Sequence, residues 1–406
     1  MELEQLWYGW SQENLDGSRG YGVVAASPGW KTLLESGSDA LGPAVAVPDI
    51  HDGRTPPASG GFVLVRGMPV VARRIPLGSD DLARPGSYGV RLVIAPDADL
   101  DALAATQLLT DGVLDDQPPP GGQRDLDPLT WTTAGPEASR PAVDHGDLVP
   151  LMAAVLQGLA DDRQVSVRVA DESVAVRLLM NAFARLPRPW LINHSFSTFE
   201  TGSASPSLRV VFRLNGWDSS DGARPTNSSV LEVDLTSRGA ADGLQPTMIR
   251  WAGSLIERDE SPWRPGAEPS DVAALGALLD SVDRARVAPH ALSADDIVTL
   301  GGSTALATWA AGSGAHHSAV RALREVAPER LGDLQAAVEL EAAASSVMTD
   351  AAWECVEADA EGSVGVANAE SVLTRQGVSQ AAIDLARVRH LPARTADSAS
   401  FDAATS

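Results

Sequence analysis

The chain has 406 residues, of which 44% are hydrophobic, and its formal net charge is −23 at pH 7. This length predicts more than one domain, because a single core seldom serves more than about 250–300 residues. The apolar fraction is that of folded proteins. So strong a negative charge repels phosphate backbones and anionic lipid, and we expect neither nucleic acid nor a membrane as a partner.

Residue types that carry chemistry are scarce. Lys31 is the only lysine, which excludes a P-loop lysine elsewhere in the chain and most Schiff-base sites. The single cysteine, Cys355, excludes an intramolecular disulfide and a multi-cysteine metal site. The chain shows no signal segment at its start and no apolar run that could span a bilayer, which favours a cytoplasmic location. Because residue types that carry chemistry are scarce, we expect neither a bound metal nor a cofactor.

The first 140 residues predict an N-terminal α+β domain built on a mixed sheet. Aromatic and apolar runs at 6–11 and 21–26 read as two strands, and a short helix is expected at 30–35. A hairpin around Gly67, a buried strand at 90–94 and a helix at 99–109 follow, the hairpin strands being 62–66 and 70–75. The proline-rich stretch 115–147 is expected to end this domain.

Residues 148–257 predict an α/β middle domain. A helix at 148–159 precedes a strand at 165–169, a helix at 173–186 and a strand at 190–196. This strand, helix, strand order is typical of a parallel crossover. Further strands are expected at 208–214, 230–235 and 248–252.

Residues 270–392 predict an all-α C-terminal domain. Apolar residues recur at helical spacing over 272–282, and a second helix starts at Ser293, a capping residue followed by acids. Longer helical patterns follow at 331–355, 364–373 and 381–388. The small, polar tail 393–406 is expected to be disordered.

No constellation of catalytic residues stands out in the chain. His194 and Ser195 come nearest to a base and nucleophile, but neighbouring residues on a strand point to opposite faces of the sheet. Asp144 and His145 lie in the proline-rich stretch without a second cluster in the sequence. We therefore assign no catalytic residue. The alternative is a hydrolase-type enzyme with a site between the first two domains that uses His194 or His145.

Four segments carry a resemblance to a known family. They are Gln5–Ser11, Gly22–Gly29, Arg84–Val93 and Ser195–Phe199, which read QLWYGWS, GVVAASPG, RPGSYGVRLV and SFSTF. Together they resemble the N-terminal and middle domains of the bacterial GTPase-associated protein 1 family. Relatives in that family tend to carry a histidine near Arg91, so this sequence departs from the pattern there. The resemblance covers about the first half of the chain.

The resemblance implies a non-enzymatic adaptor or scaffold that acts with a small GTPase or neighbouring-operon proteins in a bacterial conflict or signalling system. It supplies no catalytic residue. The candidate interaction or ligand surface comprises Trp7, Tyr8, Trp10, Ser27, Arg91, His194, Ser197 and Phe199. A peptide or small-ligand sensor that uses Trp7, Tyr8 and Phe199 is a further alternative.

Overall fold

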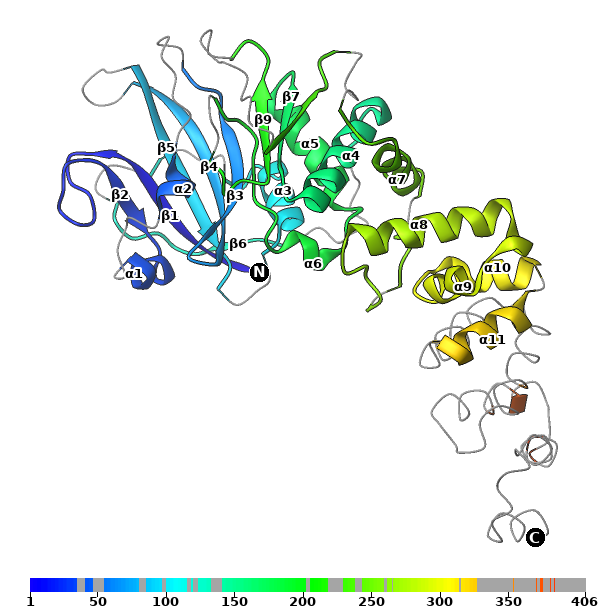
Figure 1. Ribbon diagram of the computed structural model, residues 1–406. Helices are drawn as coiled ribbons and strands as arrows, with labels where there is room; N and C mark the ends of the chain where they lie inside the picture. Colours follow the sequence, from blue (N-terminus) through cyan, green and yellow to red (C-terminus); the bar gives the residue numbers. More distant parts are fainter. Residues whose placement is uncertain are drawn as a thin grey trace. The chain divides into compact units, whose positions relative to one another are not determined.

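The fold is that of a computed structural model, which divides into two compact units, Met1–Glu257 and Arg258–Ser406 (Figure 1). The structure describes residues 1–34, 41–46, 55–79, 85–96, 100–114, 118–119, 123–132, 141–201, 205–217, 229–237, 243–258, 261–264, 266–313 and 315–326, with 353, 370, 373, 374, 380 and 383.

A mixed sheet of ten strands is the centre of the first unit. Its order is β10 (Val230–Asp234), β7 (Gln164–Val169), β9 (Val210–Leu214), β8 (Phe196–Ser197), β3 (Ser59–Val65), β4 (Met68–Ser79), β5 (Pro85–Ile94), β1 (Glu2–Ser11) and β2 (Gly20–Ala26), with β6 (Leu129–Thr130) paired to β1. The strands β10, β7, β9 and β8 are parallel, whereas β3, β4, β5, β1 and β2 form an antiparallel ladder. The two halves join where β3 pairs antiparallel with β8.

This continuity bears on the expected division between 1–140 and 148–257. Strands from both segments lie in one sheet, and both segments fall in one compact unit. The join is a short ladder in which Gly61 and Phe62 lie opposite Ser197 and Phe196. The proline-rich stretch therefore connects two parts of a single sheet.

The antiparallel half contains the hairpin expected from the sequence. The predicted hairpin is confirmed: β3 and β4 are joined by Arg66 and Gly67, both with positive φ, 53° and 81°. Such a two-residue turn matches the twist of the flanking strands. The predicted strand at 90–94 is the buried end of β5.

Helices cover both faces of this sheet (Figure 1). On one face, α1 (Pro28–Leu34) and α2 (Gly42–Val45) supply Trp30 and Val45 to a core that includes Leu6 of β1 and Leu92 of β5. The other face meets α3 (Ala102–Thr110), α4 (His145–Asp161) and α5 (Glu172–Phe183). There the ring of Phe183 packs 5.8 Å from that of Phe196 on β8.

Two predicted strands in the middle region are wrong. Residues 190–196 begin in a short helix, α6 (Arg188–Leu191), and only Phe196 and Ser197 enter the sheet. Residues 248–252 lie inside α7 (Pro246–Ile256). In both cases a proline stands in the first helical turn, where its fixed φ favours a helix and its missing N–H costs nothing. The buried residues of α7 follow a helical period: Met248, Ala252, Leu255 and Ile256.

The predicted parallel crossover is present. The chain passes from β7 through α5 and α6 to β8, which runs parallel to β7 with β9 inserted between them. The helix α4 before it begins at Asp144, whose side chain accepts from the N–H of Gly146, and ends at Asp162 in the left-handed region. This left-handed cap turns the chain directly into β7.

The described part of the second unit consists mainly of helices: α8 (Val272–Val287), η2 (Pro289–Ala291), α9 (Ala294–Leu300), α10 (Ala305–Ser313) and α11 (His316–Val326). The predicted cap at Ser293 is confirmed, since Ser293 and Asp296 form a capping box. Burial alone would raise the pKa of Asp296, but hydrogen bonds from Arg284, Ser293 and Ser281 lower it to about 2. The expected helices at 331–355, 364–373 and 381–388, Cys355 and the expected disordered tail lie outside the described residues, apart from a few single positions.

Gly89 makes room for the ring of Trp7, which gives a test of the antiparallel half. A Cβ at Gly89 would overlap the buried ring of Trp7, whereas a Cβ at Gly253 on α7 has nothing within 4 Å. We expect Gly89→Ala to lower the free energy of unfolding by about 1–3 kcal/mol through overpacking. Gly253→Ala should raise it by about 0.5–1 kcal/mol through helix propensity. Urea denaturation followed by circular dichroism checks both, and equal stabilities for the two variants would contradict the packing argument.

Candidate functional site

Ser27 joins the start of α1 to the end of the sheet. Its Oγ accepts from the N–H of Gln5 at 2.8 Å and donates to the carboxylate of Glu4. That carboxylate also accepts from the N–H of Gly29 at 2.9 Å. Ser27 has no exposed surface, so its bonds hold the chain together at this corner.

Arg91 is likewise engaged inside the protein. It is 7% exposed, and its guanidinium donates to Oε1 of Gln5 at 2.7 and 3.0 Å and to the carbonyl of Val113 at 3.2 Å. Gln5 in turn donates to the carbonyl of Asp127 at 2.5 Å. Arg91 and Gln5 together thus connect β5, the segment at Val113 and the segment at Asp127 to β1.

Ser197 and Phe199 are both fully buried. The Oγ of Ser197 accepts from Nη1 of Arg74 at 3.1 Å and donates to the carbonyl of Phe199 at 3.2 Å. The ring of Phe199 packs edge-on against Trp217, with centroids 5.6 Å apart. Both residues therefore form part of the packed interior at the carboxyl end of β8.

The aromatic residues of β1 divide between core and surface. Trp7 is 4% exposed and packs over Gly89. Tyr8 belongs to a row of stacked rings: the centroids of Tyr8 and Tyr21 are 6.5 Å apart, and those of Tyr21 and Tyr88 are 5.0 Å apart. We call these three tyrosines the tyrosine row. Burial, together with the phenol groups of Tyr8 and Tyr21, raises the pKa of Tyr88 to about 12. The phenol groups of Tyr8 and Tyr21 are therefore close enough to influence the ionisation of Tyr88.

The row reaches the surface at the last strand of the sheet. Tyr21 lies on β2 and is 39% exposed. Trp10 is its partner in the β1–β2 register, is half-buried, and has the guanidinium of Arg19 5.9 Å from its ring centroid. Of the aromatic residues in the predicted surface, Tyr8 stacks with Tyr21 in this row and Trp10 lies opposite Tyr21, whereas Trp7 is buried.

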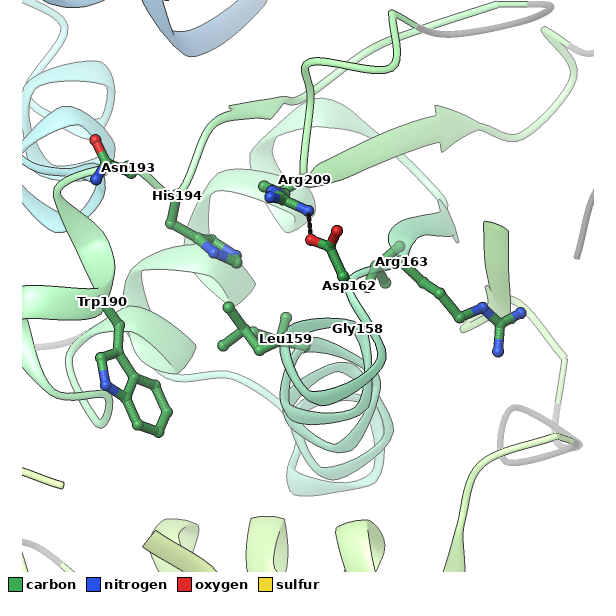
Figure 2. Close-up of a pocket in the computed structure, with 10 residues that line it drawn as sticks. Gly158, Leu159, Asp162, Arg163, Trp190, Asn193, His194 and Arg209 are labelled. Carbon is green, nitrogen blue, oxygen red and sulfur yellow. Dashed lines mark hydrogen bonds and ion pairs between the residues drawn. The ribbon is translucent and has the colours of Figure 1, made fainter. Parts of the chain in front are cut away.

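His194 lies in a different place, beside a pocket of about 200 Å³. Figure 2 shows its ring turned toward the space between Leu159 and Arg209. The pocket lies at the amino ends of β7 and β9, where α4 ends. Its lining residues are Val155, Gly158, Leu159, Asp162, Arg163, Val165, Trp190, Asn193, His194 and Arg209.

The imidazole of His194 is 4% exposed, and its Nε2 has no hydrogen-bond partner. Its ring meets Phe183 edge-on at 5.3 Å. Burial, with a smaller contribution from Arg209, lowers the pKa of His194 to about 4. At neutral pH the ring is therefore uncharged and can donate or accept one further hydrogen bond.

The expected pairing of His194 with Ser195 does not form. The Oγ of Ser195 donates to the carbonyl of Ser207 at 2.6 Å and accepts from the N–H of Arg209 at 3.2 Å. These bonds fix the loop that leads into β9. His145 is the first residue of α4 and is exposed.

His194 stands out in the sequence, but the polar groups that lie around it in the fold do not. Arg209 and Asp162 form an ion pair at the mouth of the pocket, with Nη1 and Oδ1 2.5 Å apart. The two residues are 47 positions apart in the chain. The parallel pairing of β7 with β9 brings them together, and no local pattern in the sequence signals it.

Within the described residues, no group of three or more histidine, cysteine, aspartate or glutamate side chains is placed to hold a metal ion. Among the same residues, no helix has both the length and the apolar character needed to cross a membrane. No protein-family model matches the chain, and no curated protein matches its sequence.

Proposed function

We propose that this chain is a non-enzymatic adaptor or scaffold that acts with a small GTPase in a bacterial multi-component conflict or signalling system. The resemblance of its first half to GTPase-associated proteins supports the kind of partner. The structural observation that carries the proposal is the tyrosine row, which reaches the surface through Tyr21 on the last strand of the sheet.

Two physical features make this edge suitable for a protein partner. Tyrosine and tryptophan provide large rigid contact areas with a polar end, and both are enriched at the centres of protein interfaces. An edge strand such as β2 also offers backbone donors and acceptors to an added strand. Tyr21 and Trp10 lie on this edge together.

The negative charge of the chain also indicates what kind of partner surface it favours. A formal charge of −23 favours a partner with a basic surface, because complementary charge speeds encounter and disfavours acidic competitors. We therefore expect capture of the partner to weaken as salt is raised.

The proposal is tested by affinity capture from the native host with the full chain as bait, followed by mass spectrometry. We expect a small GTPase or a neighbouring-operon protein among the captured proteins. Tyr21→Ala should reduce that capture at least about tenfold, as loss of an interface anchor typically does. Ile192→Ala is the matched control, because Ile192 is 48% exposed and follows α6 shortly before β8, a strand far from β2 in the sheet order.

Two results would overturn the proposal. Capture of neither kind of partner by the wild-type chain would remove the adaptor function. Equal capture by wild type and Tyr21→Ala would remove the tyrosine row as its binding surface. Circular dichroism of each variant confirms that it is folded before the comparison is made.

A further inference from the structure

The pocket beside His194 has the construction of a small-molecule site, and this inference goes beyond the proposed adaptor function. Its floor is apolar, with Val155 and Leu159 from α4 and Val165 from β7. Its polar residues come from the loop before β8, the residue before β9 and the turn between α4 and β7; Figure 2 shows His194, Arg209 and Asp162 among them. An apolar hollow with a few convergent polar groups is the usual form of a ligand pocket.

The volume limits the ligand to a single ring with a short chain. An apolar cavity of about 150 Å³ is large enough to hold benzene. The pocket here has about 200 Å³ and is open on one side. The indole of Trp190 stands at its border, where it can cover a planar ring (Figure 2).

His194 supplies an unmet hydrogen bond inside this hollow. The residue is 96% buried, its Nε2 has no partner, and its ring is turned into the pocket. A buried polar atom without a partner is costly, so a ligand that brings a hydroxyl to Nε2 gains that bond without displacing another. This favours a ring with a polar substituent over a bare one.

The mouth of the pocket carries one positive and one negative group. Arg209 and Asp162 pair there, and their side chains are 45% and 83% exposed. An ion pair this exposed contributes little to stability and exchanges readily with other partners. A ligand that carries both a carboxylate and an ammonium group can replace each partner of the pair by its own opposite charge.

We propose that this pocket binds a small zwitterion, an α-amino acid with a hydroxylated aromatic side chain. The carboxylate pairs with Arg209 and the ammonium group with Asp162. The ring enters the hollow against Leu159 and beside Trp190, and its hydroxyl reaches Nε2 of His194. A free anion would meet the repulsion of Asp162, and a free cation that of Arg209.

Calorimetric titration of the full chain tests the proposal with L-tyrosine as the probe. Three analogues each lack one recognition group: tyramine the carboxylate, 3-(4-hydroxyphenyl)propionate the ammonium, and L-phenylalanine the hydroxyl. We expect L-tyrosine to bind at least about tenfold more tightly than each of the two singly charged analogues, the amount that one lost charged contact typically costs.

Variants assign the binding to this pocket. Arg209→Gln and Asp162→Asn should each weaken L-tyrosine binding about tenfold. Arg168→Gln and Asp234→Asn are matched controls, because these residues form another exposed ion pair, at 4.0 Å, on neighbouring strands β7 and β10. His194→Leu should abolish the preference for L-tyrosine over L-phenylalanine while both still bind.

Three results would overturn the proposal: no binding of L-tyrosine, equal affinity for the zwitterion and the singly charged analogues, or unchanged affinity in Arg209→Gln. Arg209 and Asp162 are exposed at the surface, so their variants are expected to fold. Circular dichroism verifies this for every variant before titration.

Discussion

Arg74→Leu is expected to lower the free energy of unfolding by about 3–5 kcal/mol, the usual cost of removing one member of a buried ion pair. Arg74 on β4 is 4% exposed, and its Nη1 lies 3.6 Å from the carboxylate of Glu200. The side chain of Glu200 is 13% exposed. Without the guanidinium, this mostly buried carboxylate loses its ion-pair partner, and Ser197 loses a donor.

The surroundings of Arg74 explain why the pair matters. Burial lowers the pKa of Arg74, and the nearby Glu200 and Tyr88 oppose that shift. The cation is therefore kept in the interior by these neighbours. Because domains are stable by only about 5–15 kcal/mol, loss of this pair takes a large part of the total.

A double-mutant cycle separates the pair from its site. Arg74→Leu with Glu200→Leu removes both charges and should recover most of the loss, because an apolar pair of similar size avoids the buried charge. Arg168→Leu, in the exposed pair with Asp234, should cost less than about 1 kcal/mol. Urea denaturation followed by circular dichroism measures the wild type, Arg74→Leu, Glu200→Leu, the double variant and Arg168→Leu. A double variant as unstable as Arg74→Leu would contradict the argument.

Local patterns predicted most of the strands and helices because the signals are themselves local. Apolar runs on either side of Gly67 marked β3 and β4, and Ser293 with Asp296 marked the start of α9. The patterns failed at Trp190 and Met248, where apolar runs suggested strands. In both places a proline at the helix start outweighed the apolar run.

The sheet order could not be predicted, because it depends on pairing between distant segments. The ladder that joins β3 to β8 pairs Gly61 with Ser197 and merges two expected domains into one unit. The sequence of neither strand indicates which strand it pairs with. The same pairing decides which side chains become internal.

Pairing between distant segments also decided which candidate site residues became internal and which came to line a pocket. Nothing in the sequence marks Arg91 and Ser27 as buried, but both are hydrogen-bonded to Gln5 of β1. Gln5 lies 86 residues from Arg91 and 22 residues from Ser27. His194 was singled out for its chemistry, whereas Arg209 and Asp162 were not, since only the fold brings them to it. Residue type suggests candidates, and topology decides which of them face a pocket.

Stability of the first unit is expected to fall as the pH is lowered from 6.5 toward 4, and His194→Leu should remove much of this fall. The pKa of His194 is about 4 in the folded protein, against an ordinary value of 6.5. Below pH 6.5 the unfolded chain binds a proton at this residue, while the folded protein does not. Each pH unit in this window therefore costs about 1.4 kcal/mol, and the cost stops growing below the folded pKa.

Urea denaturation at pH 7 and pH 4.5 measures the effect. Between these two values the wild type should lose about 2.5 kcal/mol more than His194→Leu, from the linkage of proton binding to folding. His145→Leu is the matched control: His145 is exposed at the start of α4 and is not part of the pocket, so this variant should follow the wild type. Equal losses in the wild type and His194→Leu would mean that the imidazole is protonated in the fold, with its Nε2 bonded to an acceptor. In that case the pocket would offer a cation where the geometry gives a neutral ring.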